Sequence, residues 1–345
     1  MNEIARRLTQ RIRDHGPISV ADYMKAASAH YYATRDPFGP VGDFVTAPEV
    51  SQMFGELLGL WCAETWRAMG SPAHVVLAEL GPGRGTLMRD ALRAARLAPG
   101  FLEAAELHLV ETSRVLREKQ RENLASHRPA WHDSAADLPD GALLLIANEF
   151  FDALPIQQFV RGDDGWRERR IGLAEGQFAF EPGAPSAAFS DAPAGAVRER
   201  SPDAVALSSW LGARVARRGG AALIVDYGYV QGSRGDTMQA LKSHRRHDVL
   251  RDPGEADVTA HVDFAALAQA AAAAGAKIHG PVEQGAFLHA LGIGTRAAKL
   301  MEASPAQAAA IAAGLRRLTD PDAMGALFKV LAIADPALPI PAGFA

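Results

Sequence analysis

The stretch HVVLAELGPGRGT, residues 74–86, decides the fold. Residues 74–80 are short and almost wholly apolar, which predicts a β-strand, and glycines follow at positions 81, 83 and 85. Thr86 then opens a segment, residues 86–97, whose apolar side chains fall on one helical face. A strand, a tight glycine turn and a helix in this order predict an α/β sheet with a ligand site at the carboxyl end of the strand.

The alternation of strands and helices continues along the chain. Further strands are predicted at residues 106–110, 129–132, 142–147 and 221–225, near 278, and at 327–333. Further helices are predicted at residues 113–126, 203–217, 264–274 and 305–318. The segment 142–147 is nearly uniformly apolar, as in a parallel strand covered on both faces. This order predicts a doubly wound α/β fold with right-handed crossovers.

Residues 48–70 predict one long, half-buried helix on the N-terminal side of the strand. Pro48 suits the first helical position, and Gly70 suits the end of the helix. Cys62 falls on the apolar face, and we interpret it as a small core residue.

The domain organisation follows from these segments. We expect an N-terminal helical segment over residues 1–70 and a core over residues 71–345. The alternation breaks at about residues 160–202 and 228–262, where Gly, Pro and charged residues predict two insertions. Within the first, we expect a short hairpin around residues 166–180, followed by a flexible loop.

The composition excludes several classes of function. The 345 residues include 36 Lys and Arg against 40 Asp and Glu, a formal net charge of −4, so the chain lacks the basic footprint of a nucleic-acid binder. Cys62 is the only cysteine, which excludes an internal disulfide and a zinc site built on several cysteines, and we expect no metal. No apolar run approaches the ~20 residues that span a bilayer. We expect a soluble protein of the bacterial cytoplasm.

The glycine turn carries an acid that a dinucleotide-binding turn would not. Glu79 stands two residues before Gly81 in the pattern E-x-G-x-G-x-G, where it would crowd a pyrophosphate but suits the ammonium of a methionine moiety. The next strand ends at Glu111, which suits the hydroxyls of a ribose. S-adenosylmethionine has both groups and no phosphate, so we predict it as the cofactor. The predicted binding residues here are Glu79, Gly81, Gly83, Gly85, Thr86 and Glu111.

Two alternatives for this turn stay open. Three glycines can simply close a structural turn. A nicotinamide dehydrogenase is the other alternative, although its third glycine would be misplaced and no later segment predicts a substrate domain with a catalytic His–Arg pair.

A second candidate site follows the strand at residues 142–147. Asn148, Glu149 and Asp152 lie at the end where doubly wound folds bind ligands. Two carboxylates beside aromatic rings suit a cationic nitrogen. The alternative is that Glu149 or Asp152 caps a following helix.

Ordered motifs along the chain resemble the MidA family, which includes the mitochondrial complex I assembly protein arginine methyltransferases. The motifs lie at Gly42–Gln52, Phe54–Glu56, Glu79–Thr86, Asn148–Pro155, Asp226–Tyr229, Asp257–Phe264, Gln284–Leu288 and Phe328–Val330. The resemblance runs from about Gly16 to Leu331. One departure is a shorter stretch between Met24 and Tyr31 than the family usually has.

The resemblance implies a seven-stranded, Rossmann-like class I methyltransferase sheet with an N-terminal helical segment and insertions that cover the active site. It implies S-adenosylmethionine as cofactor, with Gly42, Thr46 and Asn148 as further binding residues. For the mitochondrial relatives it implies an arginine of a respiratory complex I subunit as target.

The predicted function is therefore methylation of an arginine in a protein, a complex I subunit or its bacterial equivalent. A guanidinium is a poor nucleophile unless carboxylates orient it, and we assign that role to Glu149 and Asp152, with Asn148 aligning acceptor and cofactor. His261 is a further catalytic candidate, and a structural role as a hydrogen-bond donor where a helix begins stays open. The alternative function is an assembly or chaperone-like factor that binds a partner protein with little catalysis. The oligomeric state stays open.

Overall fold

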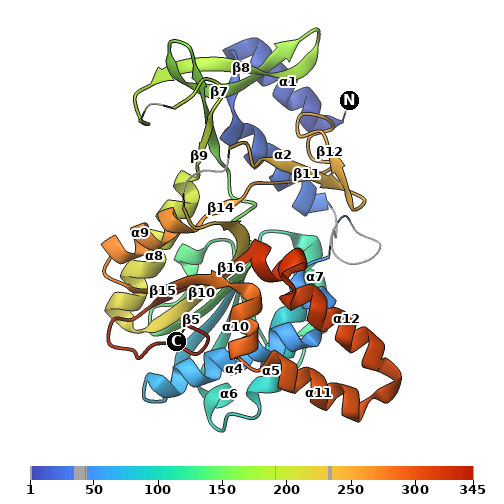
Figure 1. Ribbon diagram of the computed structural model, residues 1–345, viewed down its shortest axis with the longest axis vertical. Helices are drawn as coiled ribbons and strands as arrows, with labels where there is room; N and C mark the ends of the chain where they lie inside the picture. Colours follow the sequence, from blue (N-terminus) through green and yellow to red (C-terminus); the bar gives the residue numbers. More distant parts are fainter. Residues whose placement is uncertain (1, 35–42, 44, 191, 232–234, 345) are drawn as a thin grey trace.

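The computed structural model describes residues 2–34, 43, 45–190, 192–231 and 235–344. The elements form two lobes (Figure 1). The lower lobe holds the largest sheet and its covering helices, and the upper lobe holds two smaller sheets with the first two helices. Gly42, predicted to bind the cofactor, lies outside the described residues.

The large sheet confirms the doubly wound fold. Its strand order is β15 (Lys277–Glu283), β16 (Phe328–Ala334), β10 (Gly220–Tyr229), β5 (Leu143–Asn148), β2 (Val75–Leu80), β3 (Ala105–Val110) and β4 (Ala130–His132). Strands β10, β5, β2, β3 and β4 pair in parallel, whereas β16 is antiparallel to both of its neighbours. A two-residue strand, β14 (Val262–Asp263), pairs with the end of β10. From β2 the chain adds β3 and β4 on one side, and it then adds β5 and β10 on the other side. The ligand crevice is expected at the carboxyl ends of β2 and β5, where this direction reverses.

Helices cover both faces of this sheet. On one side lie α4 (Gln52–Ala68), α5 (Thr86–Ala95), α6 (Phe101–Ala104), α10 (Gln284–Ala290), α11 (Ile293–Ala303) and α12 (Ala308–Thr319). On the other lie α8 (Pro202–Arg218) and α9 (Phe264–Ala273). The remaining short elements near the sheet are α7 (Arg114–Asn123), η1 (Ala135–Asp137), η2 (Pro305–Gln307) and η3 (Pro321–Gly325).

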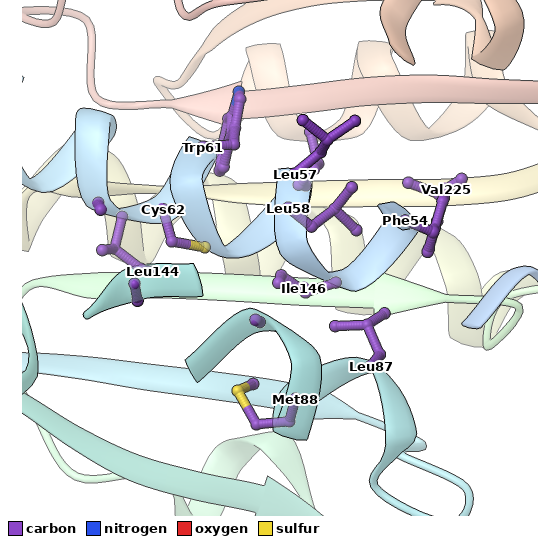
Figure 2. Close-up of a cluster of buried hydrophobic side chains, with 14 of the residues drawn as sticks. Phe54, Leu57, Leu58, Trp61, Cys62, Leu87, Met88, Leu144, Ile146 and Val225 are labelled. Atoms are coloured by element: carbon purple, nitrogen blue, oxygen red, sulfur yellow. The ribbon is translucent and has the colours of Figure 1, made fainter. Parts of the chain in front are cut away.

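The side chains of β5 alternate between the two cores. Leu144 and Ile146 face α4 and α5 (Figure 2), whereas Leu145 packs with α8 and α9. All three are fully buried, and each contributes roughly 1.5–3 kcal/mol relative to an exposed side chain. This two-sided burial explains why the segment is uniformly apolar. Cys62 lies in the same core, 1% exposed, which confirms its predicted role.

The helix predicted at residues 48–70 is two helices. A short α3 (Ala47–Val50) ends at Ser51, whose backbone is extended, and α4 begins at the next residue. The Ser51 hydroxyl accepts a hydrogen bond from the N–H of Met53, so it caps α4. The apolar period runs through this break, which is why periodicity alone predicted one helix.

Two glycines bring α4 and α5 into backbone contact. A Cβ at Gly55 would lie 2.7 Å from the carbonyl oxygen of Leu87, and one at Gly59 would lie 2.3 Å from that of Ala91. Both distances are too short for a real carbon atom, so only glycine permits this packing. The position of α5, which follows the glycine turn, is therefore fixed against α4.

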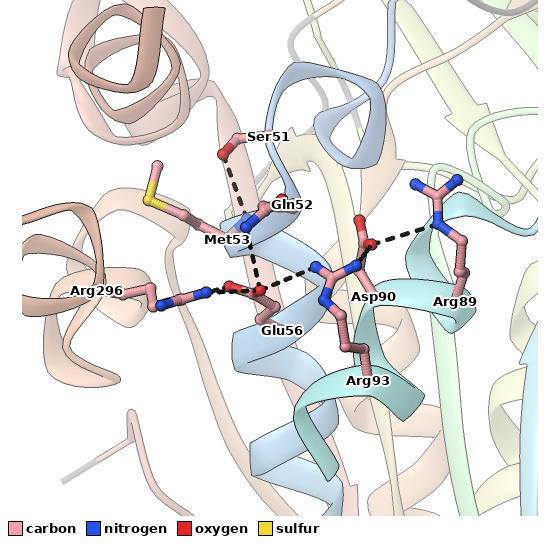
Figure 3. Close-up of polar contacts among 8 residues, drawn as sticks. All are labelled: Ser51, Gln52, Met53, Glu56, Arg89, Asp90, Arg93 and Arg296. Carbon is pink, nitrogen blue, oxygen red and sulfur yellow. Dashed lines mark hydrogen bonds and ion pairs between the residues drawn. The ribbon is translucent and has the colours of Figure 1, made fainter. Parts of the chain in front are cut away.

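A buried ion-pair network joins α4, α5 and α11 (Figure 3). The Glu56 carboxylate accepts hydrogen bonds from Arg296 at 2.7 Å and from Arg93 at 2.9 Å, and Arg93 also pairs with Asp90 at 2.6 Å. Burial would raise the pKa of Glu56, but the two arginines outweigh it and lower the pKa. The charge of Glu56 is thus retained and cross-links three helices.

The two insertions form sheets. The first builds β6 (Gln157–Gly162), β7 (Gly165–Ala174), β8 (Gln177–Ser186) and β9 (Val197–Arg200), joined by β1 (Ile18–Ser19). The second builds β11 (Gln239–Lys242), β12 (Arg245–His247) and β13 (Asp257–Thr259). The hairpin predicted at residues 166–180 exists but is longer, because β8 continues to Ser186. The stretch expected after it as a loop also contains β9, and the described residues between β8 and β9 form no helix or strand.

The upper lobe also takes in α1 (Glu3–His15) and α2 (Val20–Thr34). Leu8 and Tyr23 share a buried cluster with Ile171 of the first insertion and Val258 of the second. By contrast, α4 packs in the lower lobe. Residues 1–70 are therefore divided between the two lobes. We propose that the two lobes, and not the segments before and after residue 70, are the structural units of the protein.

Candidate active site

The turn after β2 has the backbone that its glycines allow. Gly81, Gly83 and Gly85 have φ angles of 60°, 53° and 78°, in the left-handed region that other residues rarely adopt. A Cβ at Gly81 would lie 2.8 Å from the ring of Phe150. Thr86 begins α5, and its hydroxyl donates to Glu49 at 2.6 Å. A side chain at Gly81 would therefore collide with Phe150.

Two buried oxygens beside the turn lack a hydrogen-bond partner among the described residues: Glu79 Oε2 and Asn148 Oδ1. Burial, with a smaller effect of the charge of Glu111, raises the pKa of Glu79 to about 8. Both residues line a small cavity of about 40 Å³ with Thr46 and Gly81. Unpaired buried acceptors are costly, so this cavity fits a group that brings N–H donors and positive charge, such as an ammonium.

Glu111 lies at the end of β3, 8% exposed. It accepts hydrogen bonds from the N–H of Ser113 at 2.8 Å and from the side-chain amide of Gln120 at 3.3 Å. The same amide donates to the carbonyl oxygen of Gly83 at 2.7 Å, so Gln120 ties the acid to the turn. Burial raises the pKa of Glu111. The sequence analysis missed Gln120, because nothing distinguishes one glutamine in a polar helix.

A cavity of about 500 Å³ extends from this turn. Gly81, Gly83 and Glu111 line one part of it, and Glu149 and Asp152 line another. The loop after β4 also contributes lining residues that the sequence analysis missed, Asp133 and Ser134. Of the residues predicted as sites, this cavity and the small one beside it bring together Thr46, Glu79, Gly81, Gly83, Thr86, Glu111, Asn148, Glu149 and Asp152.

Glu149 has a strained backbone with φ of 49°, which is uncommon for a residue with a Cβ and recurs at functional sites. Its Oε1 accepts hydrogen bonds from the N–H of Ala47 at 3.2 Å and from the amide of Asn148 at 3.3 Å. Burial raises its pKa to about 8, and the charge of Asp152 adds to the rise. A cation placed beside it would reverse this shift.

Asp152 is 6% exposed, and burial raises its pKa to about 6. The hydroxyl of Tyr227 donates to its Oδ2 and lies 2.7 Å from the hydroxyl oxygen of Thr259. The fully buried Asp226 accepts hydrogen bonds from the N–H groups of Phe151 and Asp152, at 3.0 and 3.2 Å. Asp226 therefore fixes the backbone that carries the acids.

The helix-cap alternative for Glu149 and Asp152 is wrong. Residues 149–156, all of them described, contain no helix, and the chain continues into β6. Neither acid is followed by a helix that its side chain could cap. Their placement in the cavity calls for another explanation, which a ligand with positive charge supplies.

His261 lies apart from the other predicted residues. It lines a separate cavity of about 400 Å³, and its ring meets the edge of the Tyr227 ring, with centroids 5.5 Å apart. Its backbone N–H donates to the hydroxyl of Thr237, while Asp263 caps α9. A catalytic role for His261 stays a prediction. Tyr227 contacts both residues: its ring packs against His261, and its hydroxyl donates to Asp152.

Comparisons with known proteins decide the family. A family model for S-adenosyl-L-methionine-dependent methyltransferases matches residues 57–282. The chain is 38% identical to the protein arginine methyltransferase NDUFAF7 homolog, mitochondrial, of Drosophila melanogaster, over 96% of this chain and 84% of that protein. The chain belongs to this methyltransferase family.

Further comparisons agree with this assignment. The human protein arginine methyltransferase NDUFAF7, mitochondrial, is 37% identical over 95% of this chain and 82% of its own length. A crystal structure of a superfamily member from Burkholderia thailandensis, bound to S-adenosyl-homocysteine, has a TM-score of 0.87 and 29% identity. It covers 99% of this chain and 93% of that one. The cofactor of this methyltransferase is S-adenosyl-L-methionine, and the dehydrogenase alternative is excluded.

Two negative findings concern the residues that the structure describes. None of the helices there is long and apolar enough to cross a membrane. No group of three or more His, Cys, Asp and Glu side chains within the described ranges is arranged to hold a metal ion.

Proposed function

We propose that this methyltransferase methylates an arginine of a protein substrate. The observation that carries the proposal is the acidic part of the 500 Å³ cavity, where Glu149 and Asp152 lie buried beside the cofactor turn. Burial holds the pKa of both carboxyls above its ordinary value, so burial by itself disfavours their charge. A bound guanidinium would restore that charge and satisfy the carboxylates.

The chain's own residues bind the cofactor and orient the acceptor in this reaction. Glu79 and Asn148 would hold the ammonium of the cofactor, and Glu111 would hold its ribose. The sulfonium of the cofactor supplies an activated methyl group. Glu149 and Asp152 would orient the guanidinium, draw its positive charge away from the reacting nitrogen, and accept the proton that this nitrogen loses.

The relatives support this acceptor. Proteins named protein arginine methyltransferase align with nearly the whole chain. We further propose that the substrate is a respiratory complex I subunit or its bacterial equivalent, and that the protein acts in a bacterial cytoplasm whereas the relatives are mitochondrial. Gly42 and Thr46 are proposed to contribute to cofactor binding, and His261 to the acceptor side.

The test is methylation of a cell lysate that lacks this protein. Purified protein is incubated with the lysate and with cofactor labelled in its methyl group, and labelled proteins are hydrolysed to amino acids. We expect labelled methylarginine with the wild-type protein and little with Glu149→Gln. Label in another amino acid would overturn the arginine proposal. Cofactor binding with no transfer to any protein would favour the assembly-factor alternative.

A further inference from the structure

The acidic part of the cavity also contains two residues from the upper lobe, Tyr32 and Asp257. Tyr32 lies on α2, and Asp257 begins β13 in the second insertion. Figure 1 shows α2 in the upper lobe, whereas β5, which immediately precedes Glu149 and Asp152, lies in the lower lobe. Both lobes therefore supply side chains to one cavity.

Direct contacts hold Asp257 in place. The hydroxyl of Tyr32 donates to Asp257 Oδ1 at 2.8 Å. The chain after Asp257 is joined to the acidic segment, because the N–H of Ala260 donates to the carbonyl oxygen of Asp152 at 3.0 Å. The hydroxyl of Thr259 lies 2.7 Å from that of Tyr227, which donates to Asp152. Asp257 is thus fixed relative to Asp152 in two ways: by the backbone hydrogen bond of Ala260 and by the side-chain contacts through Tyr227 and Thr259.

The charges around the cavity have one sign. Its described lining residues include six acids, Glu111, Asp133, Glu149, Asp152, Asp203 and Asp257, and none that is basic. Asp152 and Asp257 are also close enough that the negative charge of Asp152 adds to burial in raising the pKa of Asp257 to about 7. The same cavity reaches the cofactor turn at Gly81 and Gly83. This surface suits a cation that is presented to the cofactor.

Glu149 and Asp152 alone offer limited capacity to a guanidinium. Ala47 and Asn148 already donate to one oxygen of Glu149, and Tyr227 donates to one oxygen of Asp152. A guanidinium has five N–H donors in a fixed plane. A further carboxylate is needed to satisfy them once the group is buried.

We propose that Asp257 is the third carboxylate of the acceptor site and that Tyr32 positions it. This inference rests on the proposed function. Tyr32 occupies Asp257 Oδ1 and leaves Oδ2 for the nitrogens that Glu149 and Asp152 do not bind. The acceptor arginine is then held between the two lobes, and its binding depends on α2 and β13 as well as on the core sheet.

The experiment compares Asp257→Asn and Tyr32→Phe with wild type, using the protein with its full chain. Asp252→Asn is the matched control, because Asp252 lies in the same insertion, is half exposed and does not line the cavity. The acceptor is a synthetic peptide that carries the methylated arginine, located by mass spectrometry of peptides from the lysate that the wild-type protein has methylated. We measure its KM and kcat, the affinity for S-adenosylmethionine by calorimetry, and the melting temperature.

We expect Asp257→Asn to raise the KM of the peptide roughly 10- to 100-fold, the usual scale for a lost charge-assisted hydrogen bond. Tyr32→Phe keeps the acid and should raise the KM by less, about 3- to 10-fold. Cofactor affinity should stay within about twofold in both variants, and Asp252→Asn should match wild type.

The outcomes distinguish failure of this inference from failure of the proposed function on which it rests. If wild type methylates arginine and both variants keep a normal KM, the roles of Asp257 and Tyr32 are wrong and the proposed function stands. If Asp257→Asn fails to fold, a normal KM in Tyr32→Phe is sufficient to overturn the positioning role. An equal loss of cofactor affinity would assign both residues to the cofactor. Absence of methylarginine with wild type would overturn both proposals.

Discussion

Replacing Glu79 with glutamine should change stability and cofactor binding in opposite directions. The substitution keeps the shape of the side chain and removes its charge. In the free protein, burial raises the pKa of Glu79 to about 8, and one of its oxygens is buried without a partner. An acid whose folded-state pKa is raised binds its proton more tightly in the folded state, so stability falls as pH rises from about 4.5 to about 8.

The size of that loss follows from the shift. Each pKa unit corresponds to about 1.4 kcal/mol, so the rise in the pKa of Glu79 from about 4.5 to about 8 costs at most ~5 kcal/mol of stability above pH 8. Free Glu79→Gln should therefore melt several degrees higher than free wild type near pH 8.5, with the difference closing toward pH 5. Wild type should recover stability when S-adenosylmethionine binds, because the ammonium pairs with the acid. The variant should bind the cofactor about 100-fold or more weakly.

Thermal unfolding between pH 5 and pH 9, with and without cofactor, tests both effects on one preparation, and calorimetry gives the affinity. If the free proteins show the same pH profile, Glu79 is not a buried acid with a raised pKa. If the variant binds S-adenosylmethionine as tightly as wild type, Glu79 does not hold the ammonium, whatever its effect on stability.

Five other substitutions give further checks. Gly83→Val puts a β-branched side chain at φ of 53° in the cofactor turn, and calorimetry on the folded variant should show cofactor binding abolished. Glu111→Ala should weaken S-adenosylmethionine and S-adenosylhomocysteine alike, by roughly 1–3 kcal/mol, since both carry the ribose. Glu149→Gln, with Asp152→Asn as its companion, should keep cofactor affinity and lose transfer by roughly 10²-fold, and near-normal turnover would remove the arginine-orienting role. Glu56→Ala removes the carboxylate that pairs with Arg93 and Arg296, but both arginines are partly exposed and can be solvated, so denaturant unfolding should show a loss of about 1–2 kcal/mol.

The local pattern of the chain was sufficient to predict the large sheet. Residues 74–86 combine a buried strand, a glycine turn and a helix, and each of these depends on near neighbours in sequence. Glu79 and Glu111 were predicted because they end adjacent strands, and parallel strands bring their carboxyl ends to one edge. The pairing of β2 with β3 confirms that geometry.

What the sequence could not predict depends on long-range packing. Tyr32 and Asp257 are 225 residues apart, and no local period indicates that they share a hydrogen bond. Strand β8 of the first insertion has exposed residues on both faces, so it lacks the alternation that predicts a half-buried strand. Asp226 lies in one of the motifs of the sequence analysis, but its role depends on a hydrogen bond that the sequence does not indicate. Its carboxylate accepts this bond from the N–H of Phe151, which is far away in the sequence.

The contact between α4 and α5 has a consequence for how this enzyme can vary. Gly55 and Gly59 leave no slack between the two helix backbones, and α5 continues directly from the turn that faces the cofactor. A methyl group added at either glycine must displace α5, and with it the N–H groups at the start of that helix. Cofactor affinity is thus encoded partly in residues that never meet the cofactor, and a screen for variants with altered affinity has good reason to begin on α4.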